Sequence, residues 1–345
     1  MEFNLEILEK YRLDGLLYKQ KHPEHDLLIW NYTPTVQYEQ KWDYITKQCR
    51  GLVTDNNGVI VSWCLKKFHN MEEHSFDMIP NESFEVFDKL DGSYISLFTY
   101  KDEIIINSRG SFNSDVSKLA ENVFKEKYKN KVTINSKITY IFELISPDNR
   151  IVLLYPENDL VLLTAFDKEG VELDIYNDVF DGFNRVKKHD GIKDFKTLKN
   201  KISNDEEGYV IRFKSGFRMK IKGDEYIRLH SIITNFSNRK IWEYLKENKS
   251  LDDLLNNVPD EFYNWVKTQS ENLKQMFQIT KQQIYVLYYN SINENMNRKE
   301  VAEIINTKDK KIRGMLFNIH DEKDIDDLIW KHLYPKYEKP FFNKD

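Results

Sequence analysis

One lysine of the chain lies in a context that favours nucleophilic chemistry. Lys89 begins the segment Lys89-Leu90-Asp91-Gly92-Ser93, between two apolar, strand-like runs. An ordinary lysine has a pKa of ~10.4 and is almost always protonated at pH 7, so a nucleophilic role requires nearby cations, a metal or burial. Taken alone, however, the segment is more typical of a β-hairpin with an Asp-Gly turn.

Other charged residues could provide such an environment. The segment Phe217-Arg218-Met219-Lys220-Ile221-Lys222 alternates, and on a strand this places Lys220 and Lys222 on one face. Two lysines on one face can bind a phosphate, although a solvated edge strand explains the segment equally well. Glu143 and Glu207 lie within or beside apolar runs, where an inward carboxylate needs a cation or a metal as its partner. A solvent-facing position explains either carboxylate alone at least as well.

These residues belong to a part of the chain that is rich in short strand signals. The apolar runs lie at 27–32, 58–63, 83–89, 93–100, 103–108, 139–145, 151–155 and 160–166. Turn residues at Asn56-Asn57-Gly58, Asp91-Gly92 and Lys101-Asp102 separate neighbouring runs and predict antiparallel hairpins. We therefore expect a sheet-rich α+β domain, and a doubly wound nucleotide-binding fold is disfavoured.

The pattern becomes helical after His230. Apolar residues recur at steps of three, four and seven, at Phe262, Val266, Leu273, Phe277, Ile284 and Leu287. A last helix is predicted around Ile325–Leu333, before Pro335. We expect two domains, 1–230 and 231–345, the second of them all-α.

The composition excludes several classes of protein. The chain has 345 residues, 40% of them hydrophobic, which is enough for substantial cores and excludes wholesale disorder. With 51 Lys+Arg against 56 Asp+Glu, the net charge of -5 gives no global positive field, so any basic site must be local. Two cysteines form neither a disulfide framework nor a zinc motif, and neither a signal peptide nor a long apolar run is evident. We expect a soluble, cytoplasmic protein, in the host cytoplasm if it is viral.

The motifs together resemble a known superfamily. In order, the chain contains Lys-x-Asp-Gly from Lys89, Phe-Glu-Leu-Ile-Ser-Pro-Asp-Asn-Arg-Ile-Val around Glu143, Glu-Gly-Tyr-Val from Glu207, and Lys-Ile-Lys from Lys220. This order resembles the covalent nucleotidyltransferases, which include ligases and capping enzymes. Ser93 after Lys-x-Asp-Gly is similar to RNA ligases, whereas DNA ligases and capping enzymes usually have Arg at the position of Tyr94.

Within the superfamily, the chain most resembles the phage RNA ligase 1 family, whose members repair broken tRNA anticodon loops. Cys49-Arg50-Gly51, Lys66-Lys67-Phe68-His69-Asn70 and Tyr226-Ile227-Arg228-Leu229-His230 carry this resemblance, which covers roughly residues 27 to 256. Two positions depart from the family pattern. His69 stands where the family favours Phe, and Arg109 stands where it favours Lys.

The resemblance implies a role for each matching residue. Lys89 would take AMP, Glu143 would lie near the nucleotide sugar, and Glu207 would act on metal-bound water. Lys220 and Lys222 would hold the α-phosphate and help depress the pKa of Lys89. Arg50 and Lys67 would bind the outgoing β- and γ-phosphates, although the sequence alone favours ordinary surface cations. The remaining matched motif residues, Asp91, Gly92, Arg109 and Tyr226, are further site candidates.

Two assignments have strong alternatives. Trp30 aligns with a nucleotide-contacting tyrosine of the family, but the sequence alone favours a core aromatic. Asp252, in Ser250-Leu251-Asp252-Asp253-Leu254, aligns with a metal-binding position. Ser250 followed by two acidic residues is equally typical of a helix N-cap.

The implied activity is that of an ATP-dependent RNA ligase. Its expected cofactors are ATP and Mg²⁺, with Mn²⁺ as a substitute, and its partner is RNA with 5'-phosphate and 3'-hydroxyl ends, such as a nicked tRNA. We expect a monomer without a membrane partner. One alternative is a DNA ligase or capping enzyme, but these usually continue from Lys-x-Lys into an OB-type barrel. Another alternative is a scaffold that binds without reacting, which gives no reason for all five charged motif residues.

Overall fold

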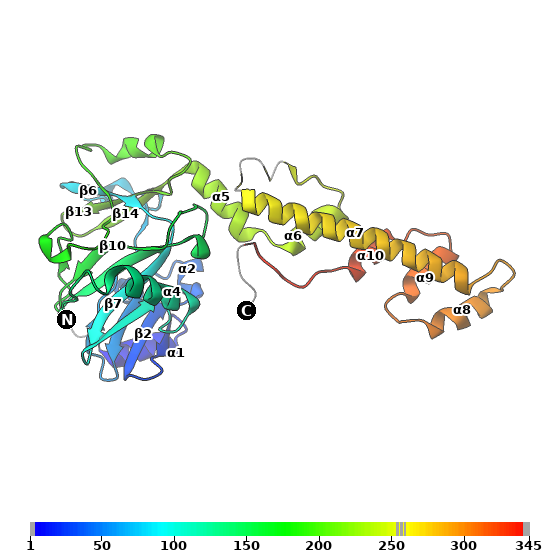
Figure 1. Cartoon of the computed structure of the whole chain (residues 1–345), viewed down its shortest axis with the longest axis horizontal. Coiled ribbons are helices and arrows are strands. Elements are labelled where there is room, and N and C mark those ends of the chain that lie inside the picture. Colours follow the sequence, from blue (N-terminus) through cyan, green and yellow to red (C-terminus); the bar gives the residue numbers. More distant parts are fainter. Residues whose placement is uncertain (1–3, 253–254, 256–257, 259, 341–345) are drawn as a thin grey trace. The chain divides into compact units, whose positions relative to one another are not determined.

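The computed structural model describes residues 4–252, 255, 258 and 260–340. It divides into two compact units, Met1–Ile227 and Arg228–Asp345. The first unit contains three β-sheets, and the second is helical (Figure 1). The predicted α+β class, with antiparallel sheets followed by helices, is confirmed.

The first sheet is an antiparallel meander near the N-terminus. Its strands, in spatial order, are β1 (Leu17–Lys21), β2 (Leu27–Tyr32), β3 (Arg50–Asp55) and β4 (Ile60–Ser62). The helices of this region are α1 (Leu5–Leu13), α2 (Pro34–Tyr38) and α3 (Tyr44–Gln48). Gly58, with a φ of 88°, allows the tight turn between β3 and β4. The hairpin predicted at Asn56-Asn57-Gly58 is therefore confirmed.

The second sheet has five strands and carries one carboxylate of the predicted site. Its spatial order is β11 (Glu172–Leu173), β10 (Asp159–Phe166), β9 (Thr139–Ile145), β7 (Ser93–Tyr100) and β8 (Glu103–Ser108). Helix α4 (Asp115–Val123) contacts β7, β8 and β10, and a π-helical turn, Phe124–Tyr128, continues it. Positive φ angles at Lys101 and Asp102 form the β7–β8 turn, as the predicted hairpin requires.

The third sheet carries the lysines. Its spatial order is β12 (Lys188–His189), β6 (Phe84–Lys89), β13 (Gly208–Phe213), β14 (Arg218–Lys222) and β5 (His69–Asn70). The β5–β14 pair is parallel, and the others are antiparallel. Met219 and Ile221 are fully buried, so Lys220 and Lys222 occupy the opposite face of β14, as the alternation predicts. Short 3₁₀ turns occur at Met71–Glu73, Phe76–Met78, Pro147–Asn149, Asp178–Phe180 and Phe195–Lys201.

Two local expectations are wrong. The Asp91-Gly92 turn is not a hairpin, because β6 and β7 belong to different sheets. The apolar run 151–155 is not a strand but an irregular segment. Backbone N–H groups of this segment donate to the Asp91 carboxylate, so a side chain from elsewhere satisfies donors that a strand would have used.

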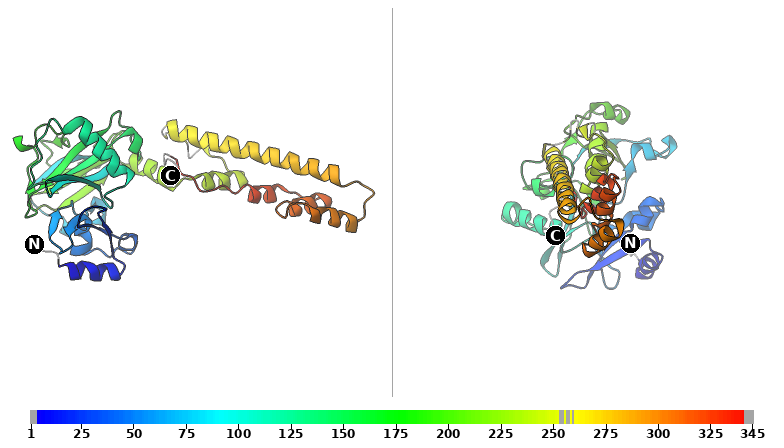
Figure 2. Two further views of the ribbon diagram at one scale, coloured as in Figure 1. Left: turned by 60° about the horizontal axis from the view of Figure 1, so that its bottom comes forward. Right: turned by 90° about the vertical axis from the view of Figure 1, so that its right-hand side faces the viewer.

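The second unit consists of helices. They are α5 (Asp224–Asn235, which begins in the first unit), α6 (Asn238–Lys246), α7 (Asp260–Ser291), α8 (Arg298–Thr307), α9 (Arg313–His320) and α10 (Asp326–His332). The long helix α7 packs against α6, α9 and α10 (Figure 2). Phe277 and Ile284 of the predicted apolar stripe belong to this unit's core. No helix among the described residues is both long enough and apolar enough to cross a membrane.

Candidate active site

Lys89 is the last residue of β6 in the third sheet, where the chain leaves that sheet for the second one. It is opposite Gly208 of β13, and the chain then crosses at Asp91-Gly92 into β7 of the second sheet. Glu143 of β9 is opposite Tyr94 of β7, so the crossover brings Lys89 to the same region as a carboxylate of the second sheet. A hairpin would have kept both segments in one sheet.

Glu207 holds two of the predicted lysines together. Its carboxylate oxygen Oε1 lies 2.8 Å from Lys89 Nζ and 2.9 Å from Lys222 Nζ. Glu207 is only 2% exposed, and the two lysine side chains are about one-fifth exposed. Burial raises the pKa of Glu207, but the charges of Lys89 and Lys222 outweigh burial, and the net pKa is below the usual value. Glu207 is therefore a charged partner that fixes the position of the Lys89 nitrogen.

Asp91 braces the turn after Lys89. Its Oδ2 accepts hydrogen bonds from the backbone N–H groups of Val152 (2.8 Å) and Leu153 (2.7 Å), and its Oδ1 accepts one from the Tyr226 hydroxyl (2.7 Å). The Asp91 N–H in turn donates to the Tyr155 hydroxyl at 3.0 Å. Asp91 is 3% exposed, so these contacts satisfy a buried charge. The aspartate of the motif has a positioning role here, and it does not face the cavity.

Two motif glycines permit close approaches of the backbone. A Cβ at Gly92 would lie 2.3 Å from the Leu144 carbonyl oxygen. Gly208 has a φ of 142°, and a Cβ there would lie 2.0 Å from the Ile221 carbonyl oxygen. Both positions require glycine, because any other side chain would force apart the backbone segments that carry Lys89, Glu143 and Glu207.

A group of cations lies beyond the Lys89–Glu207 pair. Arg50, Lys67, Arg109 and Lys220 line one cavity, and none of the four makes an ion pair with a carboxylate among the described residues. Burial, followed by the charges of Lys67, Lys89 and others, lowers the pKa of Lys220 to about 7. Burial and Arg50 likewise lower the pKa of Lys67, partly offset by Glu73. A concentration of unpaired cations indicates a site for a polyanion.

Aromatic rings support the guanidinium groups of this cluster. The Arg50 guanidinium lies 5.2 Å from the centre of the Tyr94 ring, and the Arg109 guanidinium lies 5.4 Å from that of Tyr32. Arg109 also donates a hydrogen bond to the Tyr32 hydroxyl at 3.2 Å. These contacts hold the two guanidinium groups without neutralising them.

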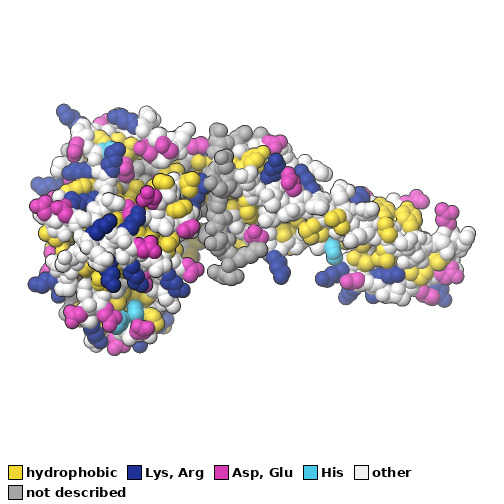
Figure 3. Space-filling model, viewed as in Figure 1, with side chains coloured by type: hydrophobic (Ala, Val, Ile, Leu, Met, Phe, Trp, Pro, Cys, Tyr) yellow, Lys and Arg dark blue, Asp and Glu magenta, His cyan; other side chains and the backbone are white. Residues whose placement is uncertain are grey.

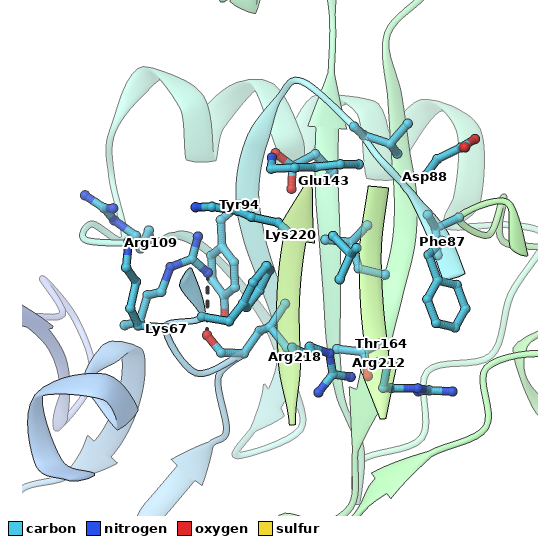
Figure 4. A pocket seen from close by; sticks show the side chains of 18 of the residues that line it. Lys67, Phe87, Asp88, Tyr94, Arg109, Glu143, Thr164, Arg212, Arg218 and Lys220 are labelled. Atoms are coloured by element: carbon cyan, nitrogen blue, oxygen red, sulfur yellow. Dashed lines mark hydrogen bonds between the residues drawn. The ribbon is translucent and has the colours of Figure 1, made fainter. Parts of the chain in front are cut away.

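The cavity has a volume of about 260 Å³ and is shown in Figure 4. Arg109, Lys67 and Lys220 lie on one side of it, Phe87 and Asp88 lie on the other, and Glu143 lies near one end. Its apolar part is lined by Phe87, Leu90, Leu163, Val186 and Val210. An apolar slot beside a cationic region matches a flat base attached to phosphates.

Two carboxylates line this cavity, Asp88, which pairs with His189 at 2.6 Å, and Glu143. Glu143 has no hydrogen bond or ion pair among the described residues. Burial raises its pKa to about 7, with Glu207 contributing in the same direction and Lys89 in the opposite one. A hydroxyl group or a cation that reached this carboxylate would supply the partner that the protein does not provide.

The nucleotide-contact assignment of Trp30 does not fit its position. Trp30 is fully buried, and its indole N–H donates to the Thr54 hydroxyl at 3.0 Å. Tyr32, two residues further along β2, lines the cavity instead. Both side chains point to the same side of the strand, but only the strand end reaches the cavity. The sequence could have indicated Tyr32, because it lies two residues after Trp30 and therefore on the same face of the strand.

Sequence reasoning also missed the polar end of the cavity. Arg212 and Arg218 line it together with Thr164 (Figure 4). Both arginines pair with Glu172, Arg212 at 2.7 Å, and Glu172 also accepts a hydrogen bond from Thr164. The alternation of β14 could have found Arg218, because it shares a strand face with Lys220 and Lys222.

Asp252 belongs to the second unit and is exposed. Its backbone N–H donates to Ser250 Oγ at 3.1 Å, and the Ser250 hydroxyl donates to Asp252 Oδ2 at 2.8 Å. These two bonds form a local turn in which the Ser250 hydroxyl is a partner of Asp252, as it would be at the N-cap that was the alternative to metal binding. Within the described residues, no group of three or more His, Cys, Asp or Glu could hold a metal ion.

Comparisons with known proteins show the family of the chain. Residues 48–226, more than half of the chain, match the model of a family described as RNA ligase. The chain belongs to this RNA ligase family. The predicted resemblance to the phage RNA ligase 1 family is thereby confirmed.

Individual relatives of the ligase are distant. It is 23% identical over 375 residues to an RNA ligase of Rhodothermus phage RM378, covering 85% of this chain and 82% of the phage protein. It is 24% identical over 266 residues to an Autographa californica nuclear polyhedrosis virus protein named as a bifunctional polynucleotide kinase/RNA ligase. That match covers 68% of this chain but 38% of the viral protein.

A similar solved structure is a Naegleria gruberi RNA ligase mutant with ATP and Mn. It is 16% identical, covers 43% of this chain and 51% of its own, and has a TM-score of 0.34.

Proposed function

We propose that this ligase joins an RNA 5'-phosphate to an RNA 3'-hydroxyl at the expense of ATP, through an enzyme lysyl-AMP and an RNA-adenylate. The observation that carries the proposal is the position of Lys89. Its nitrogen is fixed by Glu207 at 2.8 Å, next to a cavity with an apolar slot and four unpaired cations. That arrangement suits attack on the α-phosphate of a nucleoside triphosphate.

In the first step, Lys89 Nζ forms a bond to the α-phosphorus and pyrophosphate leaves. The Lys89 ammonium must lose a proton to solvent before it attacks. The bond between the α-phosphorus and the oxygen that bridges to the β-phosphorus breaks, pyrophosphate leaves with that oxygen and the electron pair, and the AMP on Lys89 keeps one negative charge. Lys220 and Lys222, on one face of β14, would hold the α-phosphate, and Arg50, Lys67 and Arg109 would hold the β- and γ-phosphates. The apolar slot between Leu163 and Val210 would hold the adenine.

The carboxylates present fit a divalent cation. ATP and a divalent metal are the expected cofactors, and we propose Mg²⁺, with Mn²⁺ as a substitute. Glu143 has no partner in the cavity, and carboxylate oxygens are the ligands that Mg²⁺ prefers. Once Lys89 carries AMP, the Glu207 carboxylate would be able to accept a hydrogen bond from a metal-bound water. The metal would supply charge neutralisation at the phosphates.

In the second step, an oxygen of the RNA 5'-phosphate bonds to the AMP phosphorus, and the phosphorus–Nζ bond breaks. The electron pair returns to Lys89 Nζ, which takes up a proton. In the third step the RNA 3'-hydroxyl loses its proton and attacks the 5'-phosphate, and AMP leaves. Arg50, Lys67 and Lys220 neutralise the charge of these transition states.

We also propose separate roles for the two parts of the chain. Residues 1–230 would perform the nucleotidyl transfer, and the helical residues 231–345 would select the RNA, for which a nicked tRNA is our candidate. Figure 3 shows lysine and arginine side chains mixed with acidic ones on the visible face, so RNA would be bound at local sites. We propose a monomer that acts in the cytoplasm, that of the host if the protein is viral.

The test is covalent labelling. Purified protein is incubated with α-labelled ATP and Mg²⁺, denatured, and examined for bound AMP. We expect label on the wild type and on Lys118→Ala, a matched exposed lysine, and none on Lys89→Ala. Covalent AMP on Lys89→Ala, or an unlabelled wild type that binds ATP, would overturn the proposal.

A further inference from the structure

A second cavity adjoins the nucleotide cavity within the first unit. Its volume is about 470 Å³, and it lies between α3, the segment after β4, the β10–β11 turn and the β13–β14 turn. Leu65, Lys67, Phe68 and Arg218 line both cavities. A ligand that extends past Lys67 therefore reaches this second space directly.

The lining of the second cavity combines aromatic rings with cations. Tyr44, Trp63, Phe68, Phe166 and Phe217 contribute rings, and Lys47, Lys66 and Lys67 contribute positive charge. Lys66 Nζ lies 5.5 Å from the centre of the Tyr44 ring. Of the two acidic residues, Glu172 is already neutralised by Arg212 and Arg218. Rings beside cations are the surroundings that bind single-stranded nucleotides.

In-line displacement fixes the side from which RNA must arrive. In the second step Lys89 is the leaving group, so the attacking 5'-phosphate enters from the side that pyrophosphate left. In the proposed first step pyrophosphate leaves toward Arg50, Lys67 and Arg109, and of these Lys67 also lines the second cavity. The RNA end therefore approaches from the Lys67 side, where the second cavity begins.

We propose that the second cavity binds the first nucleoside of the RNA strand that carries the 5'-phosphate. The 5'-phosphate would lie against Arg50 and Lys67, and the attached base would stack among the rings near Tyr44 and Lys66. This inference rests on the proposed RNA joining and adds to it a donor-strand site. The transfer forms the phosphate-oxygen–phosphorus bond and breaks the phosphorus–Nζ bond, and Lys89 regains a proton.

The experiment uses the full chain, loaded with AMP and freed of ATP. Two 5'-phosphorylated tetraribonucleotides are compared as acceptors of AMP, one normal and one whose first residue lacks its base. For the wild type, the abasic RNA should need a concentration about 10-fold higher for half-maximal transfer, because the stacked base is missing.

The double variant Tyr44→Ala/Lys66→Ala tests the cavity itself. Both side chains are exposed and lie outside the nucleotide cavity, so lysyl-AMP formation should proceed at the wild-type rate. Transfer to the normal RNA should require about 10-fold more RNA, and the preference over the abasic RNA should disappear. The matched control is Tyr38→Ala/Lys118→Ala, two exposed residues that line neither cavity, and it should behave as the wild type.

The contrary results distinguish a wrong cavity assignment from a wrong reaction. A variant that still prefers the normal RNA overturns the cavity assignment, as does a wild type that uses both RNAs equally. A wild type that forms lysyl-AMP but transfers none to either RNA overturns the proposed RNA joining as well.

Discussion

The cations of the candidate site fall into two groups that differ in whether a carboxylate neutralises them. At one end, Lys89 and Lys222 share the buried carboxylate of Glu207. At the other end, Arg50, Lys67, Arg109 and Lys220 have no carboxylate partner among the described residues. The paired end is complete in the free protein, whereas the unpaired end keeps an electrostatic cost that only a bound anion relieves. Stability and ligand binding are thus assigned to different charged groups of one site.

The largest effect is expected from neutralising the paired end. Glu207→Gln leaves two lysines facing each other without a counter-charge, so we expect a loss of about 3 kcal/mol in the free energy of unfolding. Lysyl-AMP formation should fall at least about 100-fold, because Lys89 is no longer held in place. Urea denaturation and a rapid-quench labelling assay measure the two effects. Glu157→Gln, an exposed partner of Lys127, should change stability by less than about 0.5 kcal/mol.

A Glu207→Gln variant as stable as the wild type would show that the Glu207 carboxylate does not stabilise the free protein. The proposed difference between the paired and unpaired cations would then be wrong.

Removing a charge from the unpaired cations should raise the stability of the free protein instead of lowering it. Lys67→Met keeps an unbranched side chain against the neighbouring Trp42 ring but removes one repelling charge. We expect the ligand-free protein to gain about 0.5–1 kcal/mol in stability and to lose most of its stabilisation by ATP. Thermal unfolding with and without ATP measures both quantities. Lys118→Met, at an exposed position of α4, is the matched control and should change neither. A destabilised Lys67→Met would contradict the account of stored repulsion.

The smallest effect is a pH dependence of ATP binding. Lys220 has a pKa of about 7 in the free protein because of burial and then its cationic neighbours, and phosphate binds its charged form. As pH rises from 6 to 8 the charged fraction falls from roughly nine-tenths to one-tenth, so affinity for ATP should fall by up to about 10-fold. Equilibrium titration with an unreactive α,β-methylene analogue of ATP measures this dependence.

Lys220→Arg stays charged throughout this range and should remove most of the dependence. Glu143, with its pKa raised to about 7 by burial, becomes negative over the same range and should contribute to the dependence left in that variant. An unchanged slope in Lys220→Arg would exclude Lys220 as its source.

Local pattern was sufficient for several strands of the first unit. The runs at 27–32, 93–100, 103–108 and 139–145 are strands with those same bounds. Alternation also placed Lys220 and Lys222 on one face of β14, because successive side chains of any strand point to opposite sides. The apolar run at 151–155 did not form a strand, because the Asp91 carboxylate takes the N–H groups that a strand would have used.

By itself, the sequence determined which reactive groups the protein has and the order in which they follow one another along the chain. The tertiary structure alone decided that Glu207 lies between Lys89 and Lys222, that Asp91-Gly92 crosses between sheets, and that Tyr32 rather than Trp30 reaches the cavity. The physical reason is the range of the interactions. Side-chain alternation is a property of neighbouring residues, whereas the pairing of β6 with β13 joins segments more than a hundred residues apart.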